Sequence, residues 1–230
     1  MKAMILAAGR GERMRPLTDR MPKPLLPLQG RPMIEWHLQA LAEAGVKDVV
    51  INTAWLEESF PARLGDGDRW GLSIRYSFEG RDHGGALDIA GGVAKALPWL
   101  GDAFWLVSGD IFAPDFRFDP AGAAAFAASD RLAHLWMVPN PGFHAGGDFG
   151  IGPDGLAVRD TPDRMTWSSL GLFKAGLFAG VAPGTAAPLL PQLLAGIAQG
   201  RVTAERYAGR WENVGTPEQL AALNAGGPSP

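Results

Sequence analysis

Apolar residues in the first half of the chain follow two alternating spacings. Apolar runs of strand length cover Lys2–Ala8, Val49–Asn52 and Phe104–Ser108, and Leu72–Phe78 alternates between apolar and polar residues as a strand does. Helical spacing covers Pro32–Ala44, followed by Gly45 at the position of a left-handed C-cap, and Leu87–Leu97, which stops before Pro98. Strands that alternate with helices predict βαβ units, and the loops after the strands then share one edge of a parallel sheet, where ligands bind.

The second half of the chain is less regular and carries more strand patterns. Strands are predicted over Ala133–Val138, Phe149–Ile151, Leu156–Arg159, Trp167–Phe173 and Val202–Tyr207. Pro153–Gly155 is a turn between two of them, and Leu189–Gln199 and Pro217–Leu223 have helical spacing, the latter with Thr216 as N-cap. We therefore expect one α/β domain over residues 1–224, with a Rossmann-like, mostly parallel sheet flanked by helices and a smaller β-rich part from about residue 131. Residues 225–230 contain nothing to bury, and we expect a disordered tail there.

Composition narrows the possible functions. With 230 residues, of which 47% are hydrophobic, the chain supports one large core. The net charge of −3 argues against a nucleic-acid binder, which normally carries a basic face. The absence of cysteine excludes thiolate nucleophiles, disulfides and cysteine zinc sites. The apolar run after Lys2 is too short for a signal peptide, and no run reaches the ~20 residues of a membrane span, so we expect a soluble cytoplasmic protein with no membrane partner.

The loop Gly9–Pro27 carries the most informative chemistry. Five cations stand there against two acidic residues: Arg10, Arg13, Arg15, Arg20 and Lys23 against Glu12 and Asp19. It contains no Walker motif, and a dinucleotide fingerprint would require a glycine at Met14 and a helix that the prolines forbid. Gly9 and Gly11 would let the backbone approach phosphate oxygens, and the cations would neutralise their charge. The alternative is a solvated, charged connection between two elements.

The same loop resembles a known family. Leu6–Thr18, which reads Leu-Ala-Ala-Gly-x-Gly-x-Arg-Met-x-Pro-Leu-Thr, and the following Pro22–Pro24 resemble the motif of the sugar-1-phosphate nucleotidyltransferases. The similarity continues through Pro32–Ala44, Gly91–Gly92, Ser108–Asp110 and Trp211–Pro217. Within the family, the short chain and the segments Gly147–Phe149 and Thr166–Ser168 are most similar to the uridylyltransferases that act on N-acetylmuramate α-1-phosphate.

The resemblance implies transfer of a nucleoside monophosphate from a nucleoside triphosphate to a sugar 1-phosphate, with release of pyrophosphate. It implies a nucleotide-binding half over about residues 1–130 and a sugar-phosphate-binding half over about 131–224. UTP and N-acetylmuramate α-1-phosphate are the favoured substrates. The alternatives are mannose 1-phosphate with GTP, glucose 1-phosphate with dTTP or UTP, and a non-catalytic nucleotide-sugar sensor. The oligomeric state is left open.

The resemblance also implies roles for particular residues. It assigns catalysis to Arg15, acting on the pyrophosphate, to Lys23, acting on the α-phosphate, and to Asp110, a ligand of the Mg²⁺ cofactor. Asn213 stands where relatives carry a second metal-binding aspartate, so we expect weaker metal binding.

Nucleotide and sugar contacts complete the predicted site. The nucleotide-binding residues are Ala7, Ala8, Gly9, Gly11, Glu12, Arg13, Asn52, Glu79 and the turn at Gly91 and Gly92. The sugar-phosphate-binding residues are Asn140, Asp148, Trp167 and Ser168, with Arg159 or Arg164 as a partner for a sugar carboxylate. Glu79 would accept a hydrogen bond from N3–H of uracil or from N1–H and the exocyclic amine of guanine, which leaves the base unresolved. Leu87–Ala90 departs from the Leu-Glu-Thr of relatives, and the loop Arg81–Ala86 is longer than usual, so the details of base and sugar contact are left open.

Overall fold

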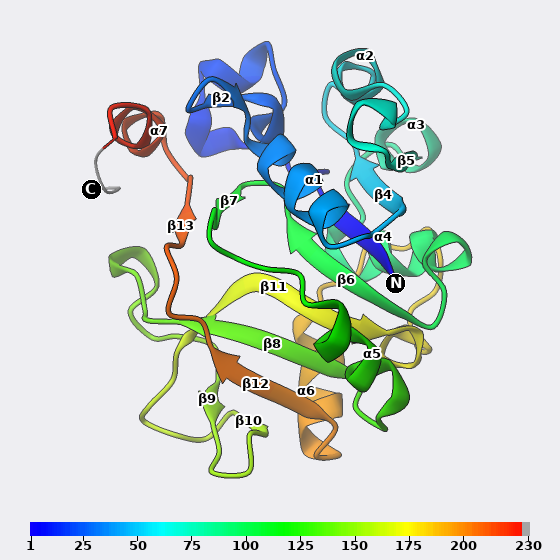
Figure 1. Cartoon of the computed structure of the whole chain (residues 1–230), viewed down its shortest axis with the longest axis vertical. Helices are drawn as coiled ribbons and strands as arrows, with labels where there is room; N and C mark the ends of the chain where they lie inside the picture. Colours follow the sequence, from blue (N-terminus) through cyan, green and yellow to red (C-terminus); the bar gives the residue numbers. More distant parts are fainter. Residues whose placement is uncertain (227–230) are drawn as a thin grey trace.

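The computed structural model describes residues 1–226, and a seven-stranded mixed sheet forms its centre (Figure 1). The strands lie in the spatial order β12-β8-β11-β6-β1-β4-β5. In chain order they are β1 Lys2–Leu6, β4 Asp48–Thr53, β5 Ser73–Phe78, β6 Ala103–Ser108, β8 Ala133–Val138, β11 Thr166–Lys174 and β12 Val202–Arg206. β5, β4, β1 and β6 are parallel, whereas β11 is antiparallel to both of its neighbours, β6 and β8. The predicted mostly parallel α/β sheet is confirmed.

Helices cover both faces of this sheet, with α1 on one face and α4 on the other. The helices of the chain are α1 Met33–Glu43, α2 Ser59–Leu64, α3 Glu79–His83, α4 Asp88–Leu100, α5 Pro120–Ala128, α6 Leu190–Ala198 and α7 Pro217–Asn224, of which α7 lies beside β2. Side chains of successive strand residues point to opposite faces, so Ile5 packs with α1 while Met4 packs with α4. Burial on both faces explains why the central strands are almost entirely apolar in sequence.

Three short antiparallel ladders accompany the main sheet. They pair β2 (Pro27–Leu28) with β3 (Arg31–Pro32), β7 (Ile111–Phe112) with β13 (Glu212–Asn213), and β9 (Gly150–Ile151) with β10 (Ala157–Val158). The β7–β13 ladder carries the C-terminal segment back toward the N-terminal loop, and α7 then packs beside β2 (Figure 1). A buried cluster joins the N-terminal loop, β7 and the segment after β13, which contribute Met14, Phe112 and Val214 to it, respectively.

Several sequence predictions need correction. Gly91 and Gly92 lie inside α4 and form no turn, and α4 continues past Pro98 to Leu100 because a proline near the helix end removes only its own N–H bond. The short helices α2, α3 and α5 were missed, and the predicted strand Leu156–Arg159 contracts to β10. Residues 225 and 226 close α7 through hydrogen bonds to its last carbonyls, so the predicted disordered tail is wrong at these two positions; the remaining tail, 227–230, lies outside the described residues.

The predicted caps are confirmed. Gly45 ends α1 with a φ of 79°, and Thr216 begins α7 in a capping box with Gln219. Within residues 1–226, no helix is long and apolar enough to cross a membrane.

Candidate active site

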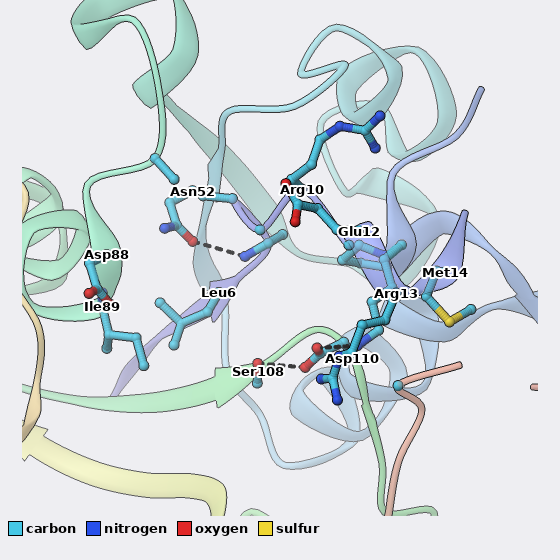
Figure 2. Close-up of a pocket in the computed structure, with 18 residues that line it drawn as sticks. Leu6, Arg10, Glu12, Arg13, Met14, Asn52, Asp88, Ile89, Ser108 and Asp110 are labelled. Atoms are coloured by element: carbon cyan, nitrogen blue, oxygen red, sulfur yellow. Dashed lines mark hydrogen bonds and ion pairs between the residues drawn. The ribbon is translucent and has the colours of Figure 1, made fainter. Parts of the chain in front are cut away.

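A cleft of about 670 Å³ opens where β1, β4 and β6 end at their carboxyl edge (Figure 2). Its walls come from the loop after β1, from the loop after β6 and from the start of α4. Gly215, which follows β13, closes one end. The parallel topology therefore gathers residues far apart in the sequence at one rim, as predicted for this class of sheet.

The loop after β1 presents a run of free backbone donors to this cleft. Gly11 has a φ of 67°, and a short 3-10 helix, Glu12–Met14, follows it. From Ala8 to Arg13, no backbone N–H donates to an acceptor within residues 1–226. A Cβ at Gly9 would meet nothing within 4 Å, whereas one at Gly11 would approach Lys23 Cβ to 3.1 Å. Successive unpaired amides around a left-handed residue make an anion-binding concavity, which suits phosphate.

A buried lysine and an aspartate face each other in the wall of the cleft. Lys23, 7% exposed, lies on the 3-10 helix Lys23–Leu25 and places Nζ 2.6 Å from Asp110 Oδ2. Ser108 donates from Oγ to Asp110 Oδ1 over 2.7 Å. Burial acts to raise the pKa of Asp110, but the charge and hydrogen bond of Lys23 outweigh it, so the pKa lies below its usual value. The carboxylate is therefore ionised at neutral pH.

The arginines of the loop divide between the cleft and the surface. Arg13 lines the cleft and lies beside Gly215, where a Cβ would sit 3.6 Å from its guanidinium carbon. Arg15 does not line the cleft: its side chain is 60% exposed, and Nε bonds Asp19 Oδ1 at 2.8 Å. Arg10 also lines the cleft, and it binds the same carboxylate oxygen and stacks on Trp55. The predicted cleft position of Arg15 is thus not found, because the 3-10 turn directs Arg13 inward and Arg15 outward.

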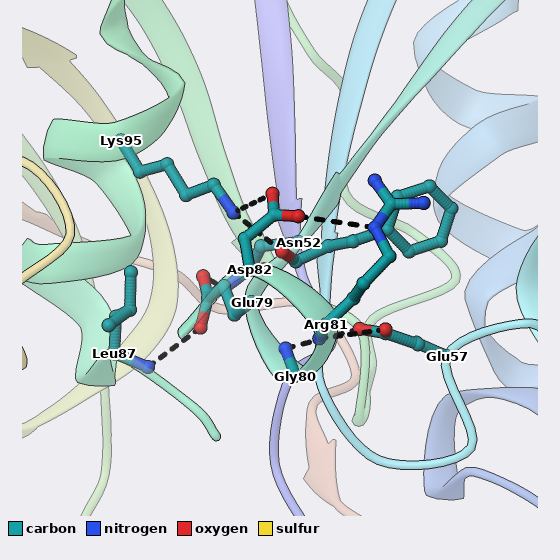
Figure 3. Close-up of polar contacts among 9 residues, drawn as sticks. Asn52, Glu57, Glu79, Gly80, Arg81, Asp82, Leu87 and Lys95 are labelled. Carbon is teal, nitrogen blue, oxygen red and sulfur yellow. Dashed lines mark hydrogen bonds and ion pairs between the residues drawn. The ribbon is translucent and has the colours of Figure 1, made fainter. Parts of the chain in front are cut away.

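Asn52 and Glu79 form an internal hydrogen-bond relay beside the cleft (Figure 3). Asn52 accepts from the Ala7 amide over 3.0 Å and donates to Glu79 Oε1 over 2.8 Å. Glu79 Oε2 accepts from the Leu87 amide over 2.7 Å. Glu79 is fully buried and does not line the cleft, and burial raises the pKa of its carboxyl group. The structure therefore places Glu79 behind Asn52, where it fixes Asn52, and not on the wall of the cleft that a base would contact.

The two helical glycines, Gly91 and Gly92, allow close packing of α4 and do not line the cleft. A Cβ at Gly92 would lie 2.6 Å from Glu79 Oε1 and 2.9 Å from Asn52 Nδ2, inside the relay. A Cβ at Gly91 would lie 2.3 Å from the Thr185 carbonyl. Both positions thus require glycine for steric reasons.

We predict that Gly92→Ala breaks the Asn52–Glu79 hydrogen bond and weakens nucleotide binding by about tenfold, since the loss of one hydrogen bond to a charged group is worth ~1.5–3 kcal/mol. Isothermal titration with the triphosphate measures this. Gly85→Ala is the matched control, because a Cβ there meets nothing within 4 Å. Equal affinity in the two variants would contradict the assigned role of the relay.

The residues beside Asp110 fit a divalent cation in part. Asn213 lies on β13 opposite Ile111, the residue after Asp110, and its buried Oδ1 has no hydrogen-bond partner within residues 1–226. The described residues contain no group of three or more His, Cys, Asp or Glu side chains able to hold a metal ion. One carboxylate and one orphaned amide oxygen suit Mg²⁺, which keeps several waters and takes phosphate oxygens as further ligands.

The four predicted sugar-phosphate-binding residues lie together around the start of β11. Asn140 accepts from Thr166 Oγ1 over 2.9 Å, and Asp148 Oδ2 accepts from the Trp167 amide over 2.8 Å. Ser168 is buried and donates to the Trp136 carbonyl over 2.7 Å. Because β11 is antiparallel, its N-terminal end reaches the same edge of the sheet as the carboxyl ends of β6 and β8. The structure thus groups these residues, and each of the four takes part in an internal hydrogen bond.

Comparison with known proteins identifies the family. Residues 2–141 match the family model described as nucleotidyl transferase. The chain is 45% identical to the N-acetylmuramate α-1-phosphate uridylyltransferase of Neisseria meningitidis, over 98% of this chain and 97% of the relative. It is 30% identical to the enzyme of the same name from Caulobacter vibrioides, over 97% and 95% of the two chains.

A solved structure supports the fold. The crystal structure of a putative glucose-1-phosphate thymidylyltransferase from Bacillus anthracis, in complex with a sucrose, superposes with a TM-score of 0.83 over 98% of this chain and 94% of the other, at 22% identity. The family resemblance inferred from the motifs is confirmed. The chain therefore belongs to the nucleotidyl transferase family, among the sugar-1-phosphate nucleotidyltransferases.

Proposed function

We propose that the protein transfers a uridylyl group from UTP to N-acetylmuramate α-1-phosphate and releases pyrophosphate. The observation that carries this reaction class is the meeting of the unpaired amides of the loop after β1 with Lys23 and Asp110 in one cleft. The choice of substrates is supported by the two full-length relatives of that name. We further propose that the reaction takes place in the cytoplasm.

The cleft residues perform this transfer mainly by positioning and charge neutralisation. A sugar-phosphate oxygen forms a bond to the α-phosphorus, and the bond from that phosphorus to the bridging oxygen breaks as pyrophosphate departs. The attacking phosphate has a second pKa of ~6 and is mostly dianionic at neutral pH, so the reaction needs no general base. Lys23 neutralises the α-phosphate, and the amides from Ala8 to Arg13 hold the remaining phosphate oxygens.

Asp110 and Asn213 would hold Mg²⁺ through the carboxylate and the orphaned amide oxygen. When bound, the ion would supply positive charge to the phosphate oxygens during transfer. Because Lys23 and Ser108 occupy both oxygens of Asp110 in this structure, a ligand to Asp110 must share or replace these partners.

We propose that Arg13, and not Arg15, stabilises the departing pyrophosphate, since Arg13 lines the cleft and Arg15 is paired with Asp19 outside it. Arg13→Ala is expected to lower kcat by about 10²- to 10³-fold, the usual loss for one preorganised donor to a developing negative charge. Arg15→Ala, the matched control two residues away, is expected to stay within about threefold of the unmodified enzyme. Steady-state pyrophosphate release measures both, and a larger loss in Arg15→Ala would reverse the assignment.

A matrix of four triphosphates against N-acetylmuramate α-1-phosphate, mannose 1-phosphate and glucose 1-phosphate tests the proposed function, with pyrophosphate release as the readout. The highest kcat/KM is expected for UTP with N-acetylmuramate α-1-phosphate. A higher value for GTP with mannose 1-phosphate, or for glucose 1-phosphate with dTTP or UTP, would replace the proposed substrates. Absence of pyrophosphate release from every pair would favour a nucleotide-sugar sensor.

A further inference from the structure

The two ends of the cleft differ in chemistry (Figure 2). Arg13, Lys23 and Asp110 provide charge at one end, which the proposed function assigns to the phosphates. On the other side Figure 2 shows Leu6 of β1, Asn52 of β4, and Asp88 and Ile89 at the start of α4. This second end is left for the base, and the inference below rests on the proposed function.

Few polar groups at the base end are free to distinguish one base from another. Asn52 accepts the Ala7 N–H on its amide oxygen and donates one N–H of its amide to Glu79, so the second N–H of Asn52 is its remaining donor toward a ligand. Glu79 itself is fully buried and accepts from Asn52 and Leu87. Asp88, by contrast, is exposed and lines the cleft. Three described carboxylates line the cleft, Glu12, Asp88 and Asp110; Asp110 is paired with Lys23, and Asp88 lies on the side of Leu6 and Ile89.

The backbone around Asp88 is held in an uncommon conformation. Its φ is 59°, in the left-handed region that L-residues other than glycine rarely adopt. Both backbone polar groups of the preceding residue, Leu87, are hydrogen-bonded. Its N–H donates to Glu79 (Figure 3), and its carbonyl accepts from the Ala187 amide over 2.9 Å. The Ala187 carbonyl in turn accepts from the Ala90 and Gly91 amides. A strained residue kept in place by such surroundings is typical of a binding site.

The Asp88 side chain is also oriented. Its Oδ1 accepts a hydrogen bond from the Ile89 amide over 2.6 Å, which leaves Oδ2 as the oxygen available to a ligand. An ionised carboxylate oxygen accepts and never donates. A single accepting oxygen matches the one ring N–H of uracil or thymine, whereas guanine presents two adjacent donors and the ring N3 of cytosine is an acceptor that a carboxylate repels.

We propose that Asp88 is a specificity-determining residue, which selects a uracil-type base by accepting a hydrogen bond from its N3–H. The sequence suggests Glu79 as the acceptor of the hydrogen bond from the base, and this proposal assigns that role to Asp88 instead. Glu79 keeps an indirect part, because its hydrogen bond to Leu87 helps to hold Asp88 in position.

Asp88→Asn tests the proposal with almost no change of shape. The amide oxygen of asparagine replaces Oδ1 toward Ile89, and its NH₂ group then offers a donor to the base. The ratio of kcat/KM for UTP to that for CTP is expected to fall by about 10- to 100-fold, since a site that loses hydrogen-bond complementarity loses discrimination. Equilibrium titration with UTP and CTP should show the same change in the ratio of Kd values.

Asp88→Gly is a second variant, which tests the proposal even if Asp88→Asn does not fold. Glycine adopts a positive φ readily, so the thermal unfolding midpoint should not fall, while the preference for UTP over CTP should be lost. UTP-to-CTP ratios equal to those of the unmodified enzyme in both variants would overturn the proposal.

The binding titrations also separate this proposal from the proposed function. If the unmodified enzyme binds UTP selectively but does not turn it over with N-acetylmuramate α-1-phosphate, the proposed function fails while a loss of selectivity in the Asp88 variants still supports the proposal. If the unmodified enzyme binds GTP more tightly than UTP, the single-acceptor argument for Asp88 is overturned.

Discussion

Replacing Lys23 by methionine is expected to lower kcat by about 10³-fold, the range found when a preorganised cation is removed from a phosphoryl-transfer site. Methionine keeps most of the side-chain volume but removes the ammonium that lies 2.6 Å from Asp110. On the proposed function, the α-phosphate then loses the charge of the buried Lys23 ammonium. Single-turnover measurement of pyrophosphate release separates this chemical loss from a change in substrate affinity.

Lys95→Met is the matched control for Lys23→Met. Lys95 is also mostly buried and pairs with Asp82 at 2.7 Å, yet neither residue lines the cleft. The control should lose some stability and almost no activity. If both lysine variants lost activity equally, Lys23 would act through the fold, and its proposed place beside the α-phosphate would be wrong.

Replacing Asp110 by asparagine is expected to abolish magnesium-dependent turnover, with a loss of at least about 10³-fold. The variant keeps the shape of the side chain and removes the charge that would hold Mg²⁺ beside Asn213. Mn²⁺ binding, followed by electron paramagnetic resonance in the presence of UTP, provides a readout besides activity. Asp82→Asn is the control, and Mn²⁺ affinity that is unchanged in Asp110→Asn would remove this residue from the metal site.

The pH dependence of stability gives a second measurement on Asp110→Asn. Because the folded-state pKa of Asp110 lies below its ordinary value, its ionised form stabilises the fold above the unfolded pKa, ~3.9, and this contribution disappears as the pH falls through the folded pKa. The difference in unfolding free energy between the unmodified enzyme and the variant should therefore be largest near pH 7 and shrink below about pH 4. Urea denaturation at several pH values measures it.

Local sequence was enough to predict the α/β class and the phosphate loop. Strand-length apolar runs such as that containing Ile5 belong to strands buried on both faces, and the caps at Gly45 and Thr216 depend on residues within a few positions. The two glycines of the loop combined with its cations indicated phosphate binding, and Lys23 lies in the cleft as expected. Interactions between near neighbours decide these features, so the sequence displays them directly.

Other features of the site depend on contacts that the periodicity of the sequence does not display. The choice between Arg13 and Arg15 follows from a 3-10 turn and from the pairing of Arg15 with Asp19. The inward position of Glu79 follows from its bonds to Asn52 and Leu87, which periodicity does not encode. The strained conformation of Asp88 gives no sequence signal beyond its departure from the residue usual in relatives.

By itself, the sequence determined the elements, the family and the chemical character of the phosphate loop, because periodicity, caps and charged motifs act over a few residues. Only the tertiary structure decided which side chains reach the cleft. Strand direction at β11, the return of β13 beside β7 and the relay through Asn52 each join segments that are many positions apart. Burial and hydrogen-bond satisfaction across such distances are set by packing of the whole chain, and they determine which of several similar side chains faces the ligand.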